Sequence, residues 1–110
     1  MREYIAIFVT VPTGDEAQSI AQRLLERKLV ACANLVAGVQ SLFWWQGKID
    51  NATEVLMVLK TRRELLDEVT QTVRETHSSE VCEVIALPIV GGNPAYLRWI
   101  DESVWVPRGT

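Results

Sequence analysis

Residues 30–45 read VACANLVAGVQSLFWW and carry no charged side chain, and a second largely apolar run, EVLMVLKT, follows at residues 54–61. The first run is shorter than the about 20 apolar residues that span a membrane, and Asn34 and Gly38 interrupt it. Its β-branched and aromatic residues, with the turn signal Gln46-Gly47-Lys48, are typical of one arm of a β-hairpin. We therefore predict a long hairpin and no membrane span.

The length of this arm has a consequence for assembly. About 16 extended residues at roughly 3.3 Å each reach on the order of 50 Å, whereas a compact domain of this chain length is roughly 35 Å across. An apolar ribbon that contains Trp44 and Trp45 would aggregate if it stayed in water. We therefore expect another subunit to cover the ribbon, and we predict an obligate oligomer whose function lies between subunits.

The composition indicates one domain over residues 1–110 in a reducing cytoplasm. The chain has 110 residues, of which 48% are hydrophobic, and this suffices for a single core. Its net charge of −3 argues against a nucleic-acid partner, because such proteins usually carry a basic surface. The N-terminal sequence MREYIAIFVTVP has no signal-peptide pattern, and Cys32 and Cys82 alone do not form a disulfide framework.

Strand and helix patterns alternate along the chain. In chain order, we predict a strand over residues 4–11, a helix after the capping box at 13–16, the two hairpin arms, a helix after a second capping box at 61–64, a strand over 81–90 in which Pro88 indicates an edge or bulge, and a helix that starts at Asn93-Pro94. The first helix has apolar residues at the helical period, namely Ala17, Ile20, Ala21, Leu24 and Leu25. The inner face of the second is expected to carry Leu65, Leu66, Val69 and Val73, and the last helix contains Tyr96, Leu97, Ile100 and Val104.

This order of elements predicts the fold class. It contains two split β-α-β units, which form an α+β, ferredoxin-like sandwich with a four-stranded antiparallel sheet, helices on one face and an added C-terminal helix. The other face of such a sheet would be bare and apolar. It is a second reason to expect an oligomer, most simply a homotrimer with three sheets packed around an axis.

Two longer strings resemble a known family. They are ACANLVAGVQSLFWWQGKIDNATEVLMVLKT at residues 31–61 and HSSEVCEVIALPIVGGNPAYLRWI at residues 77–100. Both are similar to the CutA divalent-ion-tolerance family, whose pattern reads approximately A-C-V-N, W-W-x-G-K, K-T, H-P-Y-E-V-P-E and G-N-x-x-Y-L-x-W. The resemblance covers nearly the whole chain. Ser78, Ser79 and Cys82 depart from it, because they stand where the family pattern has proline, tyrosine and proline.

The resemblance implies a homotrimer of ferredoxin-like protomers, related in architecture to PII-type signalling trimers. It also implies association with copper and other divalent cations, and it implies no reaction. No further cofactor is expected.

The chain offers few ligands for such a cation. Copper favours thiolate and imidazole ligands, and carboxylates can complete a harder site, so the candidates are Cys32, His77, Cys82 and Glu80. His77 is the only histidine, and within one subunit it can form no two-histidine site. A lone cysteine is often a small buried hydrophobic residue, and a lone histidine after a helix often forms a hydrogen bond at the end of that helix. These structural roles stay open as alternatives to metal binding. Together with the resemblance, the residues lead us to predict copper near a subunit boundary, bound mainly by Cys32 and His77.

Strand alternation arranges the remaining candidates. Within residues 80–83 it would place Glu80 and Cys82 on one face and Val81 and Glu83 on the other. Trp44 and Trp45 should likewise face opposite ways, one into the core and one into the seam between subunits. The residues expected at an interface or cleft are Trp44, Trp45, Glu54, Lys60, Glu83, Tyr96 and Trp99.

Catalysis finds no support in the sequence. One histidine offers no basis for a Ser-His-Asp arrangement, and the chain has no Gly-x-x-x-x-Gly-Lys loop. The loop at residues 11–15 lacks the arginine with which acylphosphatases of this fold class bind phosphate. We therefore predict a non-enzymatic, metal-binding trimer. The alternatives are a PII-like regulatory trimer with a small ligand in its intersubunit clefts, and a trimeric structural adaptor.

Overall fold

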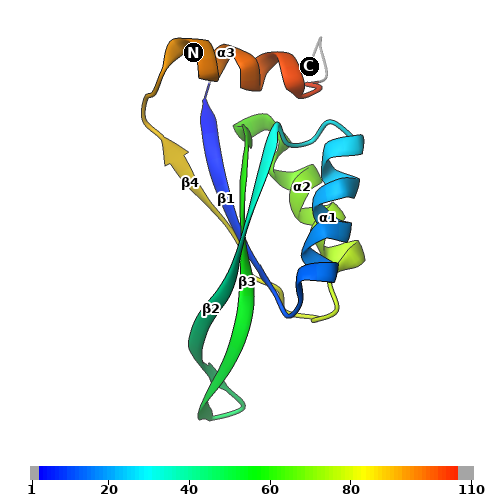
Figure 1. Cartoon of the computed structure of the whole chain (residues 1–110), viewed down its shortest axis with the longest axis vertical. Coiled ribbons are helices and arrows are strands. Elements are labelled where there is room, and N and C mark those ends of the chain that lie inside the picture. Colours follow the sequence, from blue (N-terminus) through cyan, green and yellow to red (C-terminus); the bar gives the residue numbers. More distant parts are fainter. Residues whose placement is uncertain (1–2, 107–110) are drawn as a thin grey trace.

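A computed structural model describes residues 3–106 of the chain, and its elements follow the predicted order (Figure 1). The elements are β1 (Tyr4–Val11), α1 (Gly14–Glu26), β2 (Cys32–Trp45), β3 (Lys48–Arg62), a 3-10 turn (Arg63–Leu65), α2 (Leu66–Thr76), β4 (Val84–Ile89) and α3 (Pro94–Ser103). The extent of the domain over residues 1–110 stays a prediction, since its first two and last four residues lie outside the described part.

The four strands form one antiparallel sheet in the order β2-β3-β1-β4. Alternate residues of β1 are buried, and Ile7 faces the same side as Leu59 of β3. Helices α1 and α2 cover this side (Figure 1), and their buried residues join the core. Full burial of each such aliphatic side chain contributes about 1.5–3 kcal/mol. The predicted ferredoxin-like fold class is thus confirmed, and so is the edge position of Pro88, because β4 is an outer strand.

The opposite side of the sheet, here called the open face, has no helix layer (Figure 1). Its apolar residues include Val36 on β2 and Ile85 and Leu87 on β4, and all three are exposed in the single chain. The predicted bare apolar face is therefore present.

The predicted long hairpin is confirmed. Its turn has positive φ at Gln46 (49°) and Gly47 (78°), the combination that a type I′ turn requires. Strand β1 pairs with β3 only from Val55 onward, so residues 39–54 form a two-stranded ribbon that extends beyond the sheet. Figure 1 shows this ribbon projecting past both α1 and α2, and the protein is 46 Å long but only 26 × 24 Å across.

Both tryptophans of the ribbon are exposed, Trp44 by 73% and Trp45 by 50%. The prediction that one of them packs in the core of its own chain is wrong. Alternation does turn them to opposite faces, but the ribbon reaches beyond the core, so neither face meets it. Apolar neighbours such as Leu42 and Ile49 are exposed at the same end.

Helices α1 and α3 begin as predicted. The Thr13 hydroxyl accepts a hydrogen bond from the Glu16 amide (3.2 Å) at the start of α1. The Asn93 side chain accepts from the Ala95 amide (3.1 Å) and Pro94 opens α3. Figure 1 shows α3 lying across the end of the sheet that is opposite the hairpin tip.

The second predicted capping box is wrong. Thr61 is still part of β3 and fully buried, and its hydroxyl donates to the Leu29 carbonyl (2.7 Å). The helix α2 begins only at Leu66, after the 3-10 turn, and has no side-chain cap. Core burial of the strand therefore overrides the local capping pattern.

The predicted bounds of the last strand are also wrong. The last strand covers only Val84–Ile89, and residues 81–83 form a loop before it. Among the residues that follow the helical period in α1 and α3, Leu25 and Tyr96 are exposed by 41% and 39%, whereas the others are buried or pack against the core. Within residues 3–106, the structure has no helix of the length and apolar character that crossing a membrane demands.

Candidate functional site

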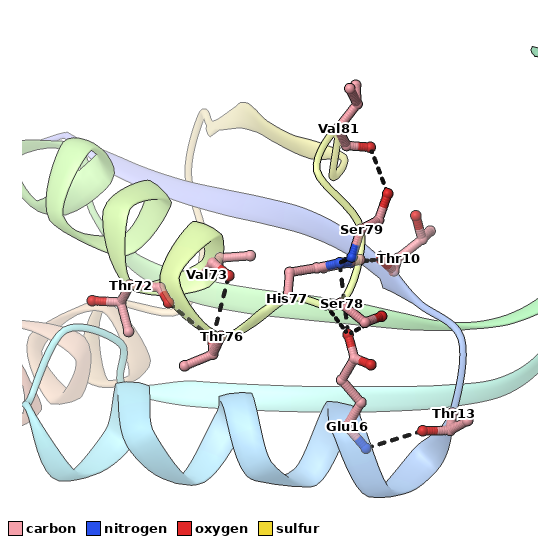
Figure 2. A network of polar contacts seen from close by, with 10 residues as sticks. All are labelled: Thr10, Thr13, Glu16, Thr72, Val73, Thr76, His77, Ser78, Ser79 and Val81. Atoms are coloured by element: carbon pink, nitrogen blue, oxygen red, sulfur yellow. Dashed lines mark hydrogen bonds and ion pairs between the residues drawn. The ribbon is translucent and has the colours of Figure 1, made fainter.

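His77 is the first residue after α2, and its side chain is only 3% exposed. Its Nδ1 accepts a hydrogen bond from the Ser79 amide (2.9 Å), and its Nε2 lies 2.8 Å from the carbonyl oxygen of Thr10 on β1 (Figure 2). Because Nδ1 accepts, these partners assign the ring proton to Nε2, which donates to Thr10. Both nitrogens are therefore engaged in this conformation, and neither has a lone pair available for a metal.

Glu16 of α1 completes this network (Figure 2). Its carboxylate accepts from the backbone amide of Ser78 (3.0 Å) and from the Ser78 hydroxyl (3.1 Å), and it lies 3.6 Å from Nδ1 of His77. The side chain that the capping box would turn back toward Thr13 is used here to hold the loop after α2. The network thus links α1, β1 and this loop.

The loop also carries the other candidate ligands. Glu80 is exposed and, with His77, borders a surface hollow beside α2. Cys82 is half-buried and packs against the core. The alternation that grouped Glu80 with Cys82 and separated Glu83 does not apply, because all three precede β4. A shared role of Glu80 and Cys82 in metal binding stays a prediction.

Cys32 is the first residue of β2 and has a free, half-buried thiol on the open face. Its Sγ lies 3.7 Å from Oδ1 of Asn34, two residues farther along the same face. The same oxygen accepts a hydrogen bond from Nζ of Lys60 (2.6 Å), the cross-strand partner of Cys32. The Lys60 ammonium also lies 5.9 Å from the centre of the Tyr96 ring.

Tyr96 and Trp99 of α3 form an aromatic pair beside this group, with ring centres 5.3 Å apart and planes tilted by 42°. The residues Cys32, Asn34, Lys60, Tyr96 and Trp99 are called the open-face cluster from here on. It unites three of the residues predicted for an interface or cleft with one predicted metal ligand. The other predicted interface residues lie elsewhere, namely Trp44 and Trp45 at the hairpin tip, Glu54 where the ribbon joins the sheet and Glu83 before β4.

Asn34 is a member of the cluster that the sequence analysis missed. The available signal was its position two residues after Cys32 on one strand, which puts both side chains on one face. Which lysine would meet it depended on the register of β2 against β3, and a register shift of one residue would have turned Lys60 away.

Cys32 and His77 do not meet within one chain. Cys32 pairs through Lys60 with Ala6, whereas His77 contacts Thr10, four positions farther along β1. The separation is roughly 13 Å along the strand and about 10 Å across two strand spacings. Among residues 3–106, no three His, Cys, Asp or Glu side chains gather in a metal-binding arrangement. Joint ligation of one ion by Cys32 and His77 therefore requires a neighbouring chain.

Comparison with known proteins agrees with the fold and with the motifs. The sequence model of the family described as CutA1 divalent ion tolerance protein matches residues 5–103. The "Divalent-cation tolerance protein CutA" of Archaeoglobus fulgidus is 47% identical over 98 residues, which are 89% of this chain and 95% of that protein. The rice "Protein CutA 1, chloroplastic" is 44% identical over 99 residues, 90% of this chain and 56% of that protein.

Solved structures give the same result. The crystal structure of CutA1 from Oryza sativa superimposes with a TM-score of 0.91 at 43% identity and covers 94% of both chains. The structure described as the periplasmic divalent cation tolerance protein CutA from Archaeoglobus fulgidus gives a TM-score of 0.89 at 45% identity, with 96% of this chain and all of that chain covered. This chain spans about half to two-thirds of the plant and frog relatives that it matches.

The match over residues 5–103, the identities above 40% and the shared fold confirm the resemblance first noted in the two sequence strings. The chain belongs to the CutA1 divalent ion tolerance family.

Proposed function

We propose that the protein is a non-catalytic, cytoplasmic homotrimer that binds copper or another divalent cation near a subunit boundary and so contributes to metal-ion tolerance. Membership of a divalent ion tolerance family supports the cation as ligand. The observation that carries the proposal is the free thiol of Cys32 on the open face, beside the side-chain oxygen Oδ1 of Asn34. A thiolate is a soft ligand of the kind that selects cuprous ion.

The trimer is supported by the exposed apolar surface of the single chain. The hairpin ribbon has no core of its own, and the open face presents Ile85 and Leu87 to solvent. Contiguous apolar surface of this kind is unusual on a monomer. Three copies around an axis would cover the open faces and let each ribbon pack on a neighbour.

Cys32 is the principal ligand in this proposal, and His77, Glu80 or Cys82 of a neighbouring chain completes the site. His77 must first give up the Ser79 amide before Nδ1 can donate its lone pair to a metal. Binding should weaken in acid, because protons compete with the metal for both the thiolate and the imidazole.

Copper titration of matched variants tests the proposal. We expect Cys32→Ser to lose stoichiometric binding, with a larger loss for cuprous than for cupric ion, since a soft ligand is removed. Cys82→Ser is the matched control for thiol chemistry and should lose less. His77→Gln should weaken binding if a neighbour's imidazole is a ligand. Parent-like copper binding by both Cys32→Ser and His77→Gln would place the metal elsewhere and refute this site.

A second candidate function is a PII-like regulatory trimer that binds a small ligand between subunits. The open-face cluster favours it, because a cation and two aromatic rings lie together at the border of an apolar face. The structural-adaptor alternative rests on the exposed apolar surface alone. Thermal shift with small ligands separates these two, since only a ligand that binds the native state raises the melting temperature.

A further inference from the structure

Lys60 and Arg62 of β3 lie next to each other on the open face, and among the described residues only Arg62 has a counter-charge. The Arg62 side chain is 13% exposed and pairs with Asp101 (3.0 Å) and with Glu64. Lys60, two residues away on the same face, is half-buried, and no carboxylate in residues 3–106 forms an ion pair with it. A partly buried charge without a counter-charge is costly, so an anion that reached Lys60 would be bound favourably.

The neighbours of Lys60 provide further donors. An ammonium group has three N–H donors, and Asn34 uses one of them through its Oδ1. The Asn34 amide has two donors on Nδ2, and none of them is bonded within the described residues. The Lys60 contact fixes the orientation of this amide, with its oxygen toward the ammonium. Lys60 and Asn34 together can therefore donate to two oxygen atoms of one carboxylate or phosphate.

The aromatic pair adds a second recognition element. In the single chain, Tyr96 and Trp99 are 39% and 41% exposed, although both belong to a helix whose Ile100 is fully buried. Their ring centres lie 5.3 Å apart, next to the ammonium that sits 5.9 Å from Tyr96. An exposed ring beside an anion-binding group is suited to stacking on a planar conjugated group of the same ligand.

We propose that the open-face cluster binds a small organic anion that carries an aromatic or conjugated ring next to its carboxylate or phosphate. Lys60 supplies the charge, Asn34 supplies a second donor, and Tyr96 with Trp99 forms the wall for the ring. This inference deepens the small-ligand candidate function and does not depend on copper. The Lys60 ammonium in fact opposes a cation at Asn34, so copper at Cys32 and the anion compete for this corner of the sheet.

Ligand-observed and amide NMR titrations of the full chain, with calorimetry, test the proposal using four probes. Benzoate has both the charge and the ring, cyclohexanecarboxylate has the charge without an aromatic ring, and benzyl alcohol has the ring without the charge. Phenyl phosphate distinguishes a phosphate from a carboxylate as the preferred anion. We expect benzoate or phenyl phosphate to shift the amides of β2, β3 and α3 around the cluster, with cyclohexanecarboxylate weaker and benzyl alcohol weakest.

Matched variants locate the site. Lys60→Met should weaken binding of the aromatic anion at least about tenfold, because the charge-assisted bond is lost. Lys48→Met, at the exposed hairpin turn, removes the same charge and should bind like the parent. Trp99→Leu should weaken the binding of benzoate more than the binding of cyclohexanecarboxylate. Equal weakening by Lys60→Met and Lys48→Met, or parent-like binding by both Lys60→Met and Trp99→Leu, would overturn the proposal.

Copper binding and oligomeric state, measured on the same variants, separate this inference from the proposed function. The anion site is supported if the Lys60→Met variant no longer binds the anion but stays oligomeric and still binds copper. If the Lys60→Met protein dissociates into monomers, two further variants test the site. Trp99→Leu should weaken binding of the aromatic anion, and the charge-retaining Lys60→Arg should preserve it. Failure of these anion outcomes with intact copper binding refutes the anion site alone.

Discussion

A single side chain, His77, shows how a residue suited to metal binding takes a structural part. Its ring joins the Thr10 carbonyl on β1 to the Ser79 amide of its own loop, and Glu16 secures the next residue from α1. A lone histidine after a helix is compatible with hydrogen bonding and with metal binding alike. The sequence does not decide between the two roles, because Thr10 and Glu16 are more than 60 positions away in the chain and only the fold brings them near.

Removal of the imidazole should destabilise the protein. We expect His77→Ala to lower the free energy of unfolding by about 1–3 kcal/mol, because it removes the hydrogen bonds of a nearly buried imidazole to the Thr10 carbonyl and the Ser79 amide. Urea denaturation at fixed protein concentration measures the effect, since oligomers unfold in a concentration-dependent way. Glu80→Ala in the same loop is the control and should stay within about 0.5 kcal/mol of the parent, because Glu80 is exposed. Equal stability of both variants would show that the His77 bonds contribute little.

Glycine at the hairpin turn provides a test at the scale of one backbone angle. Gly47 has a φ of 78°, a conformation that side-chain-bearing residues rarely adopt. We expect Gly47→Ala to lower the melting temperature, at a cost of about 1 kcal/mol. Gly14 opens α1 without such an angle and has open space around it, so Gly14→Ala should be neutral or stabilising. Identical melting curves for the two variants would contradict the assigned turn geometry.

At the scale of elements, hydrophobic periodicity predicted the number, order and type of strands and helices. The strand over residues 4–11 was predicted with its bounds, because its alternation is uninterrupted and Pro12 ends it. The boundary between β3 and α2 failed, since residues 61–64 have the same spacing as the capping box at residues 13–16. Whether Thr61 caps a helix or fills the core depends on the helices packed above it, and that information is not local.

The same contrast explains how much of the candidate site could be predicted. Cys32 and Lys60 were each singled out, but the contact between them depends on the register of β2 against β3. That register includes an irregularity between Val36 and Val39, where Gly38 has a φ of 78°. A bulge shifts the pairing of all residues beyond it, and the alternation of apolar residues in the sequence does not predict where a bulge occurs.

At the scale of the whole molecule, the exposed ribbon predicts the oligomeric state. Light scattering coupled to size exclusion should give about three times the 12.4 kDa chain mass. Because both tryptophans are exposed in the single chain, we expect Trp44→Asp and Trp45→Asp each to dissociate or precipitate the protein. Asn51→Asp, on the same hairpin, adds the same charge at a polar exposed position and should leave the mass unchanged. A monomeric parent, or soluble parent-like trimers of both tryptophan variants, would contradict the packing of the ribbon.

The two-stranded ribbon of residues 39–54 also bears on how the chain acquires its final structure. Two strands without a covering layer are marginally stable in water, so the sheet core can form within one chain while the ribbon stays open until chains meet. Ribbon amides should then exchange with deuterium quickly in dilute solution and slowly in concentrated solution, while amides of β1 exchange at nearly the same rate in both. Mass spectrometry of peptides from the two regions would read this directly. The ribbon would thus report the local concentration of its own chain, and it becomes ordered only where enough copies have been made.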